Sequence, residues 1–246
     1  MTPPAPPPIF AHLFVLGRPA GGKSEFIDFM KRLPDAGRAA EFGIGRFEEI
    51  DDFPWLWQAC VDDDAREARG GARLVSARTP EGYNITAPRF RGSLVDRFNA
   101  AIRERYLSRP SFYGEGTLLI EFARGRGDGF GDSLARFDPE ILARGAILDI
   151  KVSFEESFRR NSARYKPGQE ESILFHKVPD QDMLGFFREN DWDDLTGGAP
   201  DGYLPVAGIR VPFATMSNEP ESADPSVLRQ RYGGALGRLL HLYRTR

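Results

Sequence analysis

Short apolar runs and longer segments of helical periodicity alternate along most of this chain. The nearly all-apolar runs 9–16, 117–122 and 146–152 are typical of strands that are buried on both faces of a sheet. Further strands are expected at 46–51 and 209–214. Because strands and helices alternate, the pattern predicts a three-layer α/β/α sandwich, in which helices cover both faces of a mostly parallel sheet of about five strands.

Segments with an apolar helical face separate these strands. They predict helices over the ranges 22–33, 55–69, 94–107, 134–144, 154–164, 183–190 and 225–243. Pro34 and Gly37 are expected to end the first helix. The segments 73–77 and 83–86 flank a turn sequence and predict a hairpin, whereas 191–207 is rich in Asp, Gly and Pro and is expected to be a loop.

Composition then excludes several classes of protein. The hydrophobic share of 41% and the charged share of 28% are ordinary for a globular chain, and the net charge of −3 argues against a general nucleic-acid surface. Cys60 is the only cysteine, so the chain forms neither an intrachain disulfide nor a thiolate zinc site. No apolar run approaches the roughly 20 residues of a membrane-spanning helix. A reduced, soluble, cytoplasmic protein without a membrane partner is therefore expected.

The domain organisation is simple. Residues 1–8 are rich in proline, lack the features of a signal peptide and are expected to form a disordered leader. The remaining residues, 9–246, suit a single α/β domain with insertions.

The most specific motif follows the first expected strand. Gly17-Arg18-Pro19-Ala20-Gly21-Gly22-Lys23-Ser24 fits the pattern G-x-x-x-x-G-K-[ST] at every fixed position. The glycines let the backbone wrap around phosphate oxygens, and the following helix adds its positive N-terminal end. Lys23 is expected to reach the β- and γ-phosphates, and Ser24 to bind Mg²⁺. The motif predicts a nucleoside triphosphate site; the alternative is a turn whose glycines serve only its geometry.

The order of elements resembles that of the P-loop small-molecule kinases, which include nucleoside, nucleotide and shikimate-type kinases. The resemblance covers most of residues 9–245 and is specific in motif at 17–24, 51–53, Glu121 and 154–164. The chain has no N-K-x-D motif for guanine recognition, which favours ATP over GTP. The resemblance therefore implies a phosphotransferase that uses ATP and Mg²⁺.

The acidic residues at two strand ends take their implied roles from this resemblance. Uridine-kinase-like proteins carry Asp-x-Phe after the second strand, and by that match Asp51 is the candidate base, with Asp52 one residue out of phase. Either carboxylate is also placed to satisfy free N–H groups of the helix that begins near Pro54, so both readings stay open. Glu121 is implied, with Ser24, as a ligand of Mg²⁺; the alternative is an ordinary charge at a strand exit.

The helix 154–164 occupies the place where these kinases carry a lid. By the resemblance, Arg160 and Arg164 share a helix face and screen the phosphates during transfer. The alternative is a solvated helix with Glu-to-Arg pairs. Asn218, after the last strand, is implied as a contact of the adenine. The lid as a whole is expected over 153–182.

The acceptor molecule is the least specified part. An insertion at 70–92 is expected to contribute to its pocket, and Arg89 and Arg91 are candidates for binding an anionic acceptor. Phe53, Trp55 and Trp57 are expected either to line that pocket or to pack in the core. The first functional hypothesis is a kinase of an unidentified small molecule or nucleotide. The alternatives are an ATPase or nucleotide-dependent switch with a protein partner, and a kinase of nucleic-acid ends, which the net charge disfavours.

Overall fold

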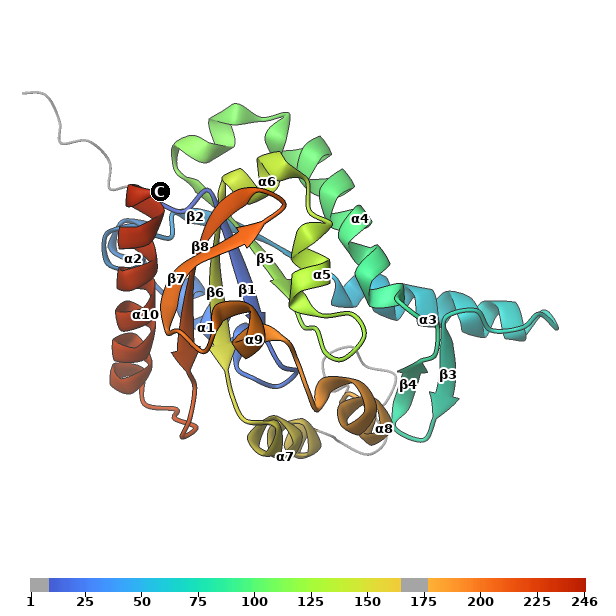
Figure 1. Ribbon diagram of the computed structural model, residues 1–246. Helices are drawn as coiled ribbons and strands as arrows, with labels where there is room; N and C mark the ends of the chain where they lie inside the picture. Colours follow the sequence, from blue (N-terminus) through green and yellow to red (C-terminus); the bar gives the residue numbers. More distant parts are fainter. Residues whose placement is uncertain (1–8, 165–176) are drawn as a thin grey trace, which may run out of the picture.

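A computed structural model describes residues 9–164 and 177–246 of the chain. The predicted leader, 1–8, and the middle of the predicted lid, 165–176, lie outside the described residues. The centre of the molecule is a six-stranded sheet with the strand order β2-β5-β1-β6-β8-β7 (Figure 1). Its strands are β1 (His12–Gly17), β2 (Arg46–Asp51), β5 (Gly116–Phe122), β6 (Gly145–Lys151), β7 (Asp201–Val206) and β8 (Ile209–Ser217).

Parallel pairing brings the carboxyl ends of most strands to one edge of the sheet. β1 pairs in parallel with β5 and β6, and β5 pairs in parallel with β2. In this register Asp51 lies directly beside Glu121. The chain leaves β1 toward β2 on one side and later adds β6 on the other, so the strand order reverses at β1. Sheets of this kind bind their ligands at such a reversal, beyond the carboxyl ends of the strands.

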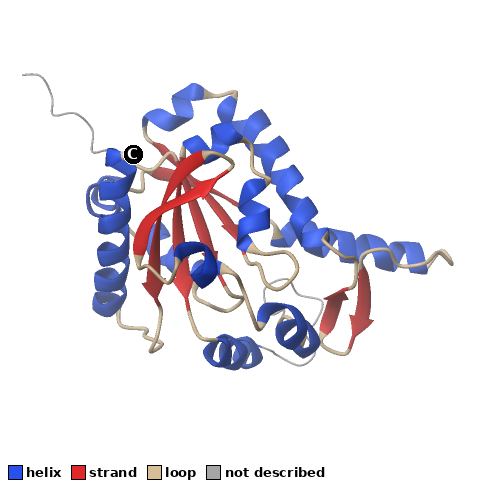
Figure 2. Ribbon diagram, viewed as in Figure 1, coloured by secondary structure: helices blue, strands red, loops and turns tan. Residues whose placement is uncertain are grey.

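Helices cover both faces of the sheet (Figure 2). One face is covered by α1 (Lys23–Lys31), α2 (Asp35–Phe42) and α10 (Pro225–Thr245). The other face is covered by α4 (Phe90–Ile102), the π-helical turn η1 (Arg103–Leu107), the 3₁₀ turn η2 (Pro110–Gly114), α5 (Phe130–Ala135), α6 (Pro139–Ala143) and α9 (Trp192–Thr196). The elements at or beyond the carboxyl edge are α3 (Phe53–Glu67), α7 (Phe154–Arg164), α8 (Asp180–Asp182) and the π-helical turn η3 (Met183–Phe187).

Alternate residues of the central strand enter two separate apolar layers. Leu13 and Val15 pack in the layer with α1 and α10, whereas Phe14 and Leu16 pack in the layer with α4 to α6. All of them are fully buried. This alternation is the pattern of a strand covered on both faces, as predicted for 9–16.

The edge of the sheet differs from the expectation. The segment 191–207, expected to be a loop, contains α9 and β7, and β7 runs antiparallel to β8. Ala207 and Gly208 join these strands with φ angles of 47° and 80°, as a tight two-residue hairpin requires. Pro205 obscured the strand pattern, yet proline is tolerated in a strand at the edge of a sheet.

One helix was not predicted, and one predicted helix is divided. α1 ends before Pro34 as expected, but α2 begins at Asp35 and contains Gly37, since the fixed φ of proline suits the residues that precede and open a helix. Arg38 of α2 is buried and donates to the carbonyl oxygens of Met30 and Ile44. The helix expected over 134–144 is interrupted before Pro139, which separates α5 from α6.

The predicted hairpin forms a second, two-stranded sheet of β3 (Ser76–Thr79) and β4 (Gly82–Ile85). It projects with α3 from the body of the molecule, beyond the carboxyl edge of the large sheet (Figure 1). Within the described ranges, no helix combines the length and the apolar character needed to cross a membrane.

Candidate active site

The carboxyl edge of the large sheet carries a cleft of about 770 Å³. Its lining includes the loop 19–24, Asp51 at the end of β2, Glu121 near the end of β5 and Arg164 at the end of α7. These residues are far apart in the sequence. The fold therefore brings the predicted phosphate loop, base, metal ligands and one of the two predicted arginines into one cavity.

The phosphate loop has a strained backbone that only certain residues accept. Ala20 and Gly22 have φ angles of 53° and 104°, in the left-handed region. A Cβ atom at Gly22 would lie 2.2 Å from Nδ2 of Asn218, so a side chain has no room there. The first turn of α1 begins directly afterwards at Lys23, and its free N–H groups lie at the cleft.

The ammonium group of Lys23 is folded back over the loop. Its Nζ donates to the carbonyl oxygens of Gly17, at 3.3 Å, and Arg18, at 3.1 Å. The same atom lies 3.9 Å from Oε1 of Glu121. Lys23 is only 7% exposed, so its charge is held between the loop and the strand end, where a phosphate on the loop would meet it.

The structure distinguishes the two adjacent aspartates. Oδ2 of Asp52 accepts from Nη1 of Arg124 at 2.7 Å, and this arginine is almost completely buried. The carboxylate of Asp52 is therefore committed to a buried ion pair. Oδ1 of Asp51 accepts from the amide of Phe53, at 3.0 Å, so the helix-capping interpretation holds for this one oxygen. The rest of the Asp51 carboxylate is available to the cleft that it lines.

The carboxyl groups at the strand ends disfavour one another's ionisation. Burial, followed by the charges of Glu121 and Asp52, raises the pKa of Asp51 to about 8. Burial also raises the pKa of Glu121, against the opposing effect of Lys23. A cation in the cleft would relieve this repulsion.

The side-chain atoms that could bind a cation beside Asp51 and Glu121 are oxygen atoms, from carboxylates and from the exposed hydroxyl of Ser24. Oxygen ligands suit a hard cation such as Mg²⁺. Across residues 9–164 and 177–246, no group of three or more His, Cys, Asp and Glu side chains forms a ready-made metal site. Phosphate oxygens and water would therefore complete the coordination shell, as is usual for Mg²⁺.

The two predicted arginines of α7 have different surroundings. Arg164 lines the cleft, and its partial burial lowers the pKa of the guanidinium, while Glu121 opposes that shift. Arg160 lies outside the cleft lining, and it donates to the carbonyl of Asn218 at 2.8 Å and to Glu156 at 2.7 Å. The Glu-to-Arg pairing expected as the alternative is thus present at Arg160, and its contact with phosphates stays a prediction.

Asn218 is also engaged behind the loop. Its side chain is 1% exposed, and its Nδ2 donates to the carbonyl of Gly21 at 3.0 Å. The predicted contact of Asn218 with adenine stays a prediction. The contact that the structure shows is with the backbone of the phosphate loop.

The cleft also has aromatic lining residues. They are Phe53, Tyr83 and Phe187. Trp55 packs in the core instead, against Phe98 at 5.1 Å between ring centroids. Trp57 packs edge to face against Tyr83 at 5.3 Å. The hairpin β3–β4 therefore contributes to the cleft, within the insertion expected at 70–92.

Beside the predicted Arg91, the cleft is lined by Asp182 and Arg124, which the sequence did not single out. Nη2 of Arg91 pairs with Oδ2 of Asp182 at 2.6 Å, and both side chains are about nine-tenths buried. The guanidinium of Arg91 also lies 4.1 Å from the ring centroid of Phe186. Asp182 belongs to a segment without regular periodicity, so no sequence signal marked it. Arg124 follows β5 by two residues, and its position after a strand end was the one available signal.

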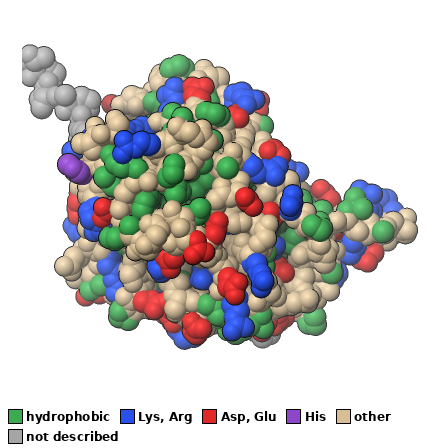
Figure 3. Space-filling view, viewed as in Figure 1, with side chains coloured by type: hydrophobic (Ala, Val, Ile, Leu, Met, Phe, Trp, Pro, Cys, Tyr) green, Lys and Arg blue, Asp and Glu red, His purple; other side chains and the backbone are tan. Residues whose placement is uncertain are grey.

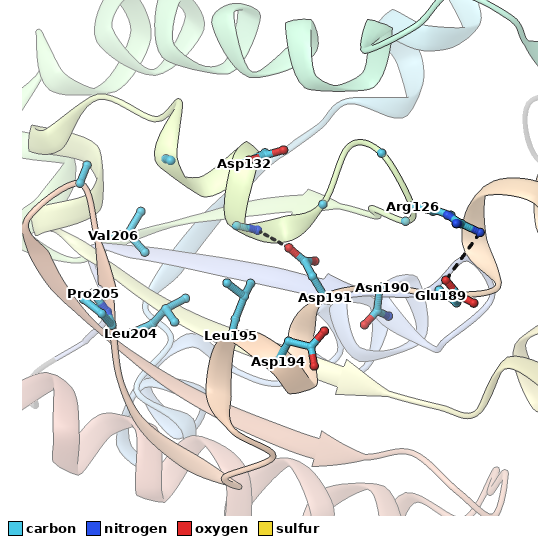
Figure 4. Close-up of a pocket in the computed structure, with 16 residues that line it drawn as sticks. Arg126, Asp132, Glu189, Asn190, Asp191, Asp194, Leu195, Leu204, Pro205 and Val206 are labelled. Carbon is cyan, nitrogen blue, oxygen red and sulfur yellow. Dashed lines mark hydrogen bonds and ion pairs between the residues drawn. The ribbon is translucent and has the colours of Figure 1, made fainter.

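A second pocket, of about 630 Å³, lies between α5, α9 and β7 (Figure 4). Its acidic lining residues are Asp132, Glu189, Asp191 and Asp194, against the single basic residue Arg126. Asp191 caps α5, since its carboxylate accepts from the amides of Phe130 at 2.7 Å and Gly131 at 2.9 Å. Acidic side chains also gather over α9 in the space-filling view (Figure 3). This charge opposes phosphate binding and leaves the first cleft as the candidate site.

Comparison with known proteins supports the fold. No family model and no curated protein matches the chain. The solved structure of Kti12 from Chaetomium thermophilum, in complex with ADP-AlF3, is 12% identical, covers 93% of this chain and 98% of its own, and has a TM-score of 0.50. A gluconokinase from Sinorhizobium meliloti is 14% identical, with coverages of 97% and 98% and a TM-score of 0.44. A sugar kinase from Janibacter is 15% identical, with coverages of 94% and 96% and a TM-score of 0.37.

The likeness to Kti12 shows a shared fold, whereas the lower scores of the two kinases carry no argument. What the likeness shows is the fold alone, a mostly parallel sheet with flanking helices.

Proposed function

We propose that this protein transfers the γ-phosphoryl group of Mg²⁺-bound ATP to a hydroxyl group of a small molecule. The observation that carries the proposal is the composition of one cleft, which is lined by the phosphate loop, by Asp51 and by aromatic side chains from other elements. A protein that only binds a nucleotide does not need this further lining. The volume of about 770 Å³ is in the range of small-molecule sites.

The nucleotide end has the parts that bind a triphosphate. Lys23 and the free amides of the loop and of α1 hold the β- and γ-phosphates. Ser24 and Glu121 hold Mg²⁺, which neutralises charge on the phosphate oxygens. The Kti12 structure contains ADP-AlF3, and its shared fold supports an adenine nucleotide in this cleft.

Asp51 is placed between the two ends. Its carboxylate accepts the proton of the acceptor hydroxyl as the bond to phosphorus forms. Burial and the neighbouring carboxylates raise the pKa of Asp51 to about 8, and a cation beside it would favour the ionised form that a base requires. Arg164, at the C-terminal end of α7, screens the charge on the transferred group.

The acceptor end suits a molecule that presents both apolar surface and hydroxyl groups. Phe53 and Tyr83 line the cleft with aromatic side chains. The buried Arg91–Asp182 pair places a donor beside an acceptor with its charges balanced, and a hydroxyl group can bond to both. A net-positive subsite for a strongly anionic acceptor is not formed by this pair.

The proposal is tested by measuring ADP and inorganic phosphate separately. The protein is incubated with Mg²⁺ and ATP, alone and with pools of hydroxyl-bearing metabolites. Formation of ADP that depends on a pool, without an equal amount of free phosphate, supports transfer. Free phosphate that forms at the same rate without any pool contradicts it and indicates hydrolysis.

The second candidate is an ATP-dependent switch that acts on a protein partner. It is favoured by the contacts of the loop with elements outside the sheet: Ser157 of α7 donates to the carbonyl of Pro19, and Arg18 donates to the carbonyl of Phe187 in η3. Loss of the γ-phosphate would move the loop, and these bonds would transmit the movement to α7 and η3.

A further inference from the structure

Two carbonyl groups of the phosphate loop are each held by a buried side chain from a distant part of the chain. Oγ of Ser157, in α7, donates to the carbonyl oxygen of Pro19 at 2.7 Å. Nδ2 of Asn218, directly after β8, donates to the carbonyl oxygen of Gly21 at 3.0 Å. Ser157 is 0% exposed and Asn218 is 1% exposed, so both bonds are shielded from water.

The geometry of the peptide unit gives these bonds a consequence for the amides. In a planar trans peptide the N–H group points opposite to the C=O group. Fixing the carbonyl of Pro19 on the α7 side therefore turns the N–H of Ala20 away from α7. Fixing the carbonyl of Gly21 turns the N–H of Gly22 away from Asn218 in the same manner. Both residues line the cleft.

The two amides have no competing acceptor in the described part of the chain. The amide of Gly21 is used within the loop, where it donates to the carbonyl of Arg18 at 3.1 Å, but no such bond is formed by the amides of Ala20 and Gly22. Free backbone N–H groups at a buried position are rare unless a ligand satisfies them. Their natural partner in this cleft is an anionic oxygen.

We propose that Ser157 and Asn218 are positioning residues for the phosphate loop, which hold the N–H groups of Ala20 and Gly22 toward the phosphates of the nucleotide. This inference deepens the proposed function and rests on it in one respect, that phosphate is the ligand of the loop. This role does not require either side chain to touch the nucleotide. They act through the backbone, from behind the loop.

The supports of Asn218 are consistent with this role. Its main-chain carbonyl accepts from Nη2 of Arg160 at 2.8 Å, and its main-chain amide donates to the carbonyl of Lys151 at 2.9 Å. Its side-chain oxygen accepts from Nη1 of Arg231 at 3.4 Å. The amide orientation of Asn218 is thereby fixed, with its NH₂ group toward Gly21. Gly22 has no Cβ at the place where Nδ2 of Asn218 lies, so the loop and this side chain fit one another.

The test measures phosphate binding separately from stability. Inorganic tripolyphosphate with Mg²⁺ is titrated calorimetrically into the wild-type protein and into the Ser157→Ala, Asn218→Ala and Ser162→Ala variants. Ser162 lies on the same helix as Ser157 but is exposed, so its variant is the matched control. We expect affinity to fall about tenfold for Ser157→Ala and for Asn218→Ala, and to stay unchanged for Ser162→Ala. Ser157→Thr, which keeps the hydroxyl, should restore most of the affinity.

The outcomes separate this inference from the proposed function. If the wild-type protein does not bind tripolyphosphate, the proposed function fails. If the wild-type protein binds it and both alanine variants bind it equally well, the positioning role is wrong.

A second measurement uses only the wild-type protein, so it can be made even if a variant fails to fold. In the wild-type protein, the amide proton resonances of Ala20 and Gly22 should move downfield when tripolyphosphate is added, as expected of new N–H donors to an anion. Unmoved resonances at both positions, with binding observed, overturn the inference.

Discussion

The two ends of the cleft are built in different ways. The phosphate end is one continuous stretch of eight residues, 17–24, and the bonds that shape it go mostly to backbone carbonyls, from Lys23, Ser157 and Asn218. The proposed acceptor end gathers side chains from α3, β4, α4 and the α8–η3 segment. Bonds between side chains hold it, such as Arg91–Asp182 at 2.6 Å.

This difference separates the chemistry of the site from its specificity. Backbone groups recognise phosphate in the same way wherever the loop has this shape, so the phosphate end depends on the few side chains that hold the shape. At the acceptor end, each contact is a side chain that can be exchanged. Substitutions at one end should therefore affect the nucleotide, and substitutions at the other should affect the acceptor.

Asp51 lies at the junction, and its substitution should have the largest effect. In Asp51→Asn the acceptor proton has no base, so the rate of phosphoryl transfer should fall by about 10³-fold, while the affinity for ATP stays close to the wild-type value. Glu49→Gln, an exposed carboxylate on the same strand, is the control and should transfer at the wild-type rate. A wild-type rate for Asp51→Asn would remove Asp51 from the reaction.

The neighbouring aspartate should behave as a structural residue. Asp52→Asn leaves the buried guanidinium of Arg124 without its counter-charge, so the free energy of unfolding should fall by about 3 kcal/mol. Denaturant titration followed by circular dichroism measures this change. Asp62→Asn, at an exposed position of α3, should change stability little. If Asp52→Asn were fully stable but inactive, the assignment of the two aspartates would have to be reversed.

The acceptor end should respond to loss of an aromatic ring. Tyr83→Ala removes part of the aromatic lining, so KM for the acceptor should rise about tenfold while KM for ATP stays unchanged. Tyr83→Phe keeps the ring and should resemble the wild-type protein in KM for the acceptor, although it loses the hydrogen bond to Asp64. Equal changes in both KM values for Tyr83→Ala would contradict the separation of the two ends.

The smallest expected effect is on stability at acid pH, and it arises from His12 at the opposite edge of the sheet from the cleft. Burial lowers the pKa of His12 to about 4, against an ordinary value of 6.5. Between these values the unfolded chain binds a proton that the folded protein excludes, so stability is lost as pH falls. The free energy of unfolding should drop by about 1 kcal/mol between pH 6.5 and pH 5.5, and His12→Gln should lack this contribution.

Thermal unfolding at a series of pH values measures this slope. If the slope is unchanged in His12→Gln, the acid sensitivity of the protein arises elsewhere.

Much of the phosphate end could be predicted from the sequence, because its motif is local. The strand, the loop and the first turn of α1 are adjacent in the chain, and their order is itself the signal. The position of Glu121 followed from a run of apolar residues that ends beside the loop in the sheet. Pairing in register then placed Asp51 beside it, which no local pattern specifies but parallel topology requires.

The acceptor end could not be predicted in the same way. The pairing of Arg91 with Asp182 joins residues 91 positions apart, and Asp182 lies in a segment without periodicity. Arg160 and Arg164 show a further limit, since helical spacing placed both on one face but only Arg164 lines the cleft. The path of β7 was missed because Pro205 is compatible with a strand only at an edge, and edge position is a property of the whole sheet.

The central claim is that phosphates bind on the loop from Gly17 to Ser24. Its most direct test is equilibrium titration of Mg²⁺ and ATP into the wild-type protein and into Lys23→Ala and Lys31→Ala, which remove a buried and an exposed lysine of the same helix. The account predicts binding that is weakened about a hundredfold in Lys23→Ala and unchanged in Lys31→Ala. Equal affinity of the wild-type protein and Lys23→Ala for ATP would contradict it.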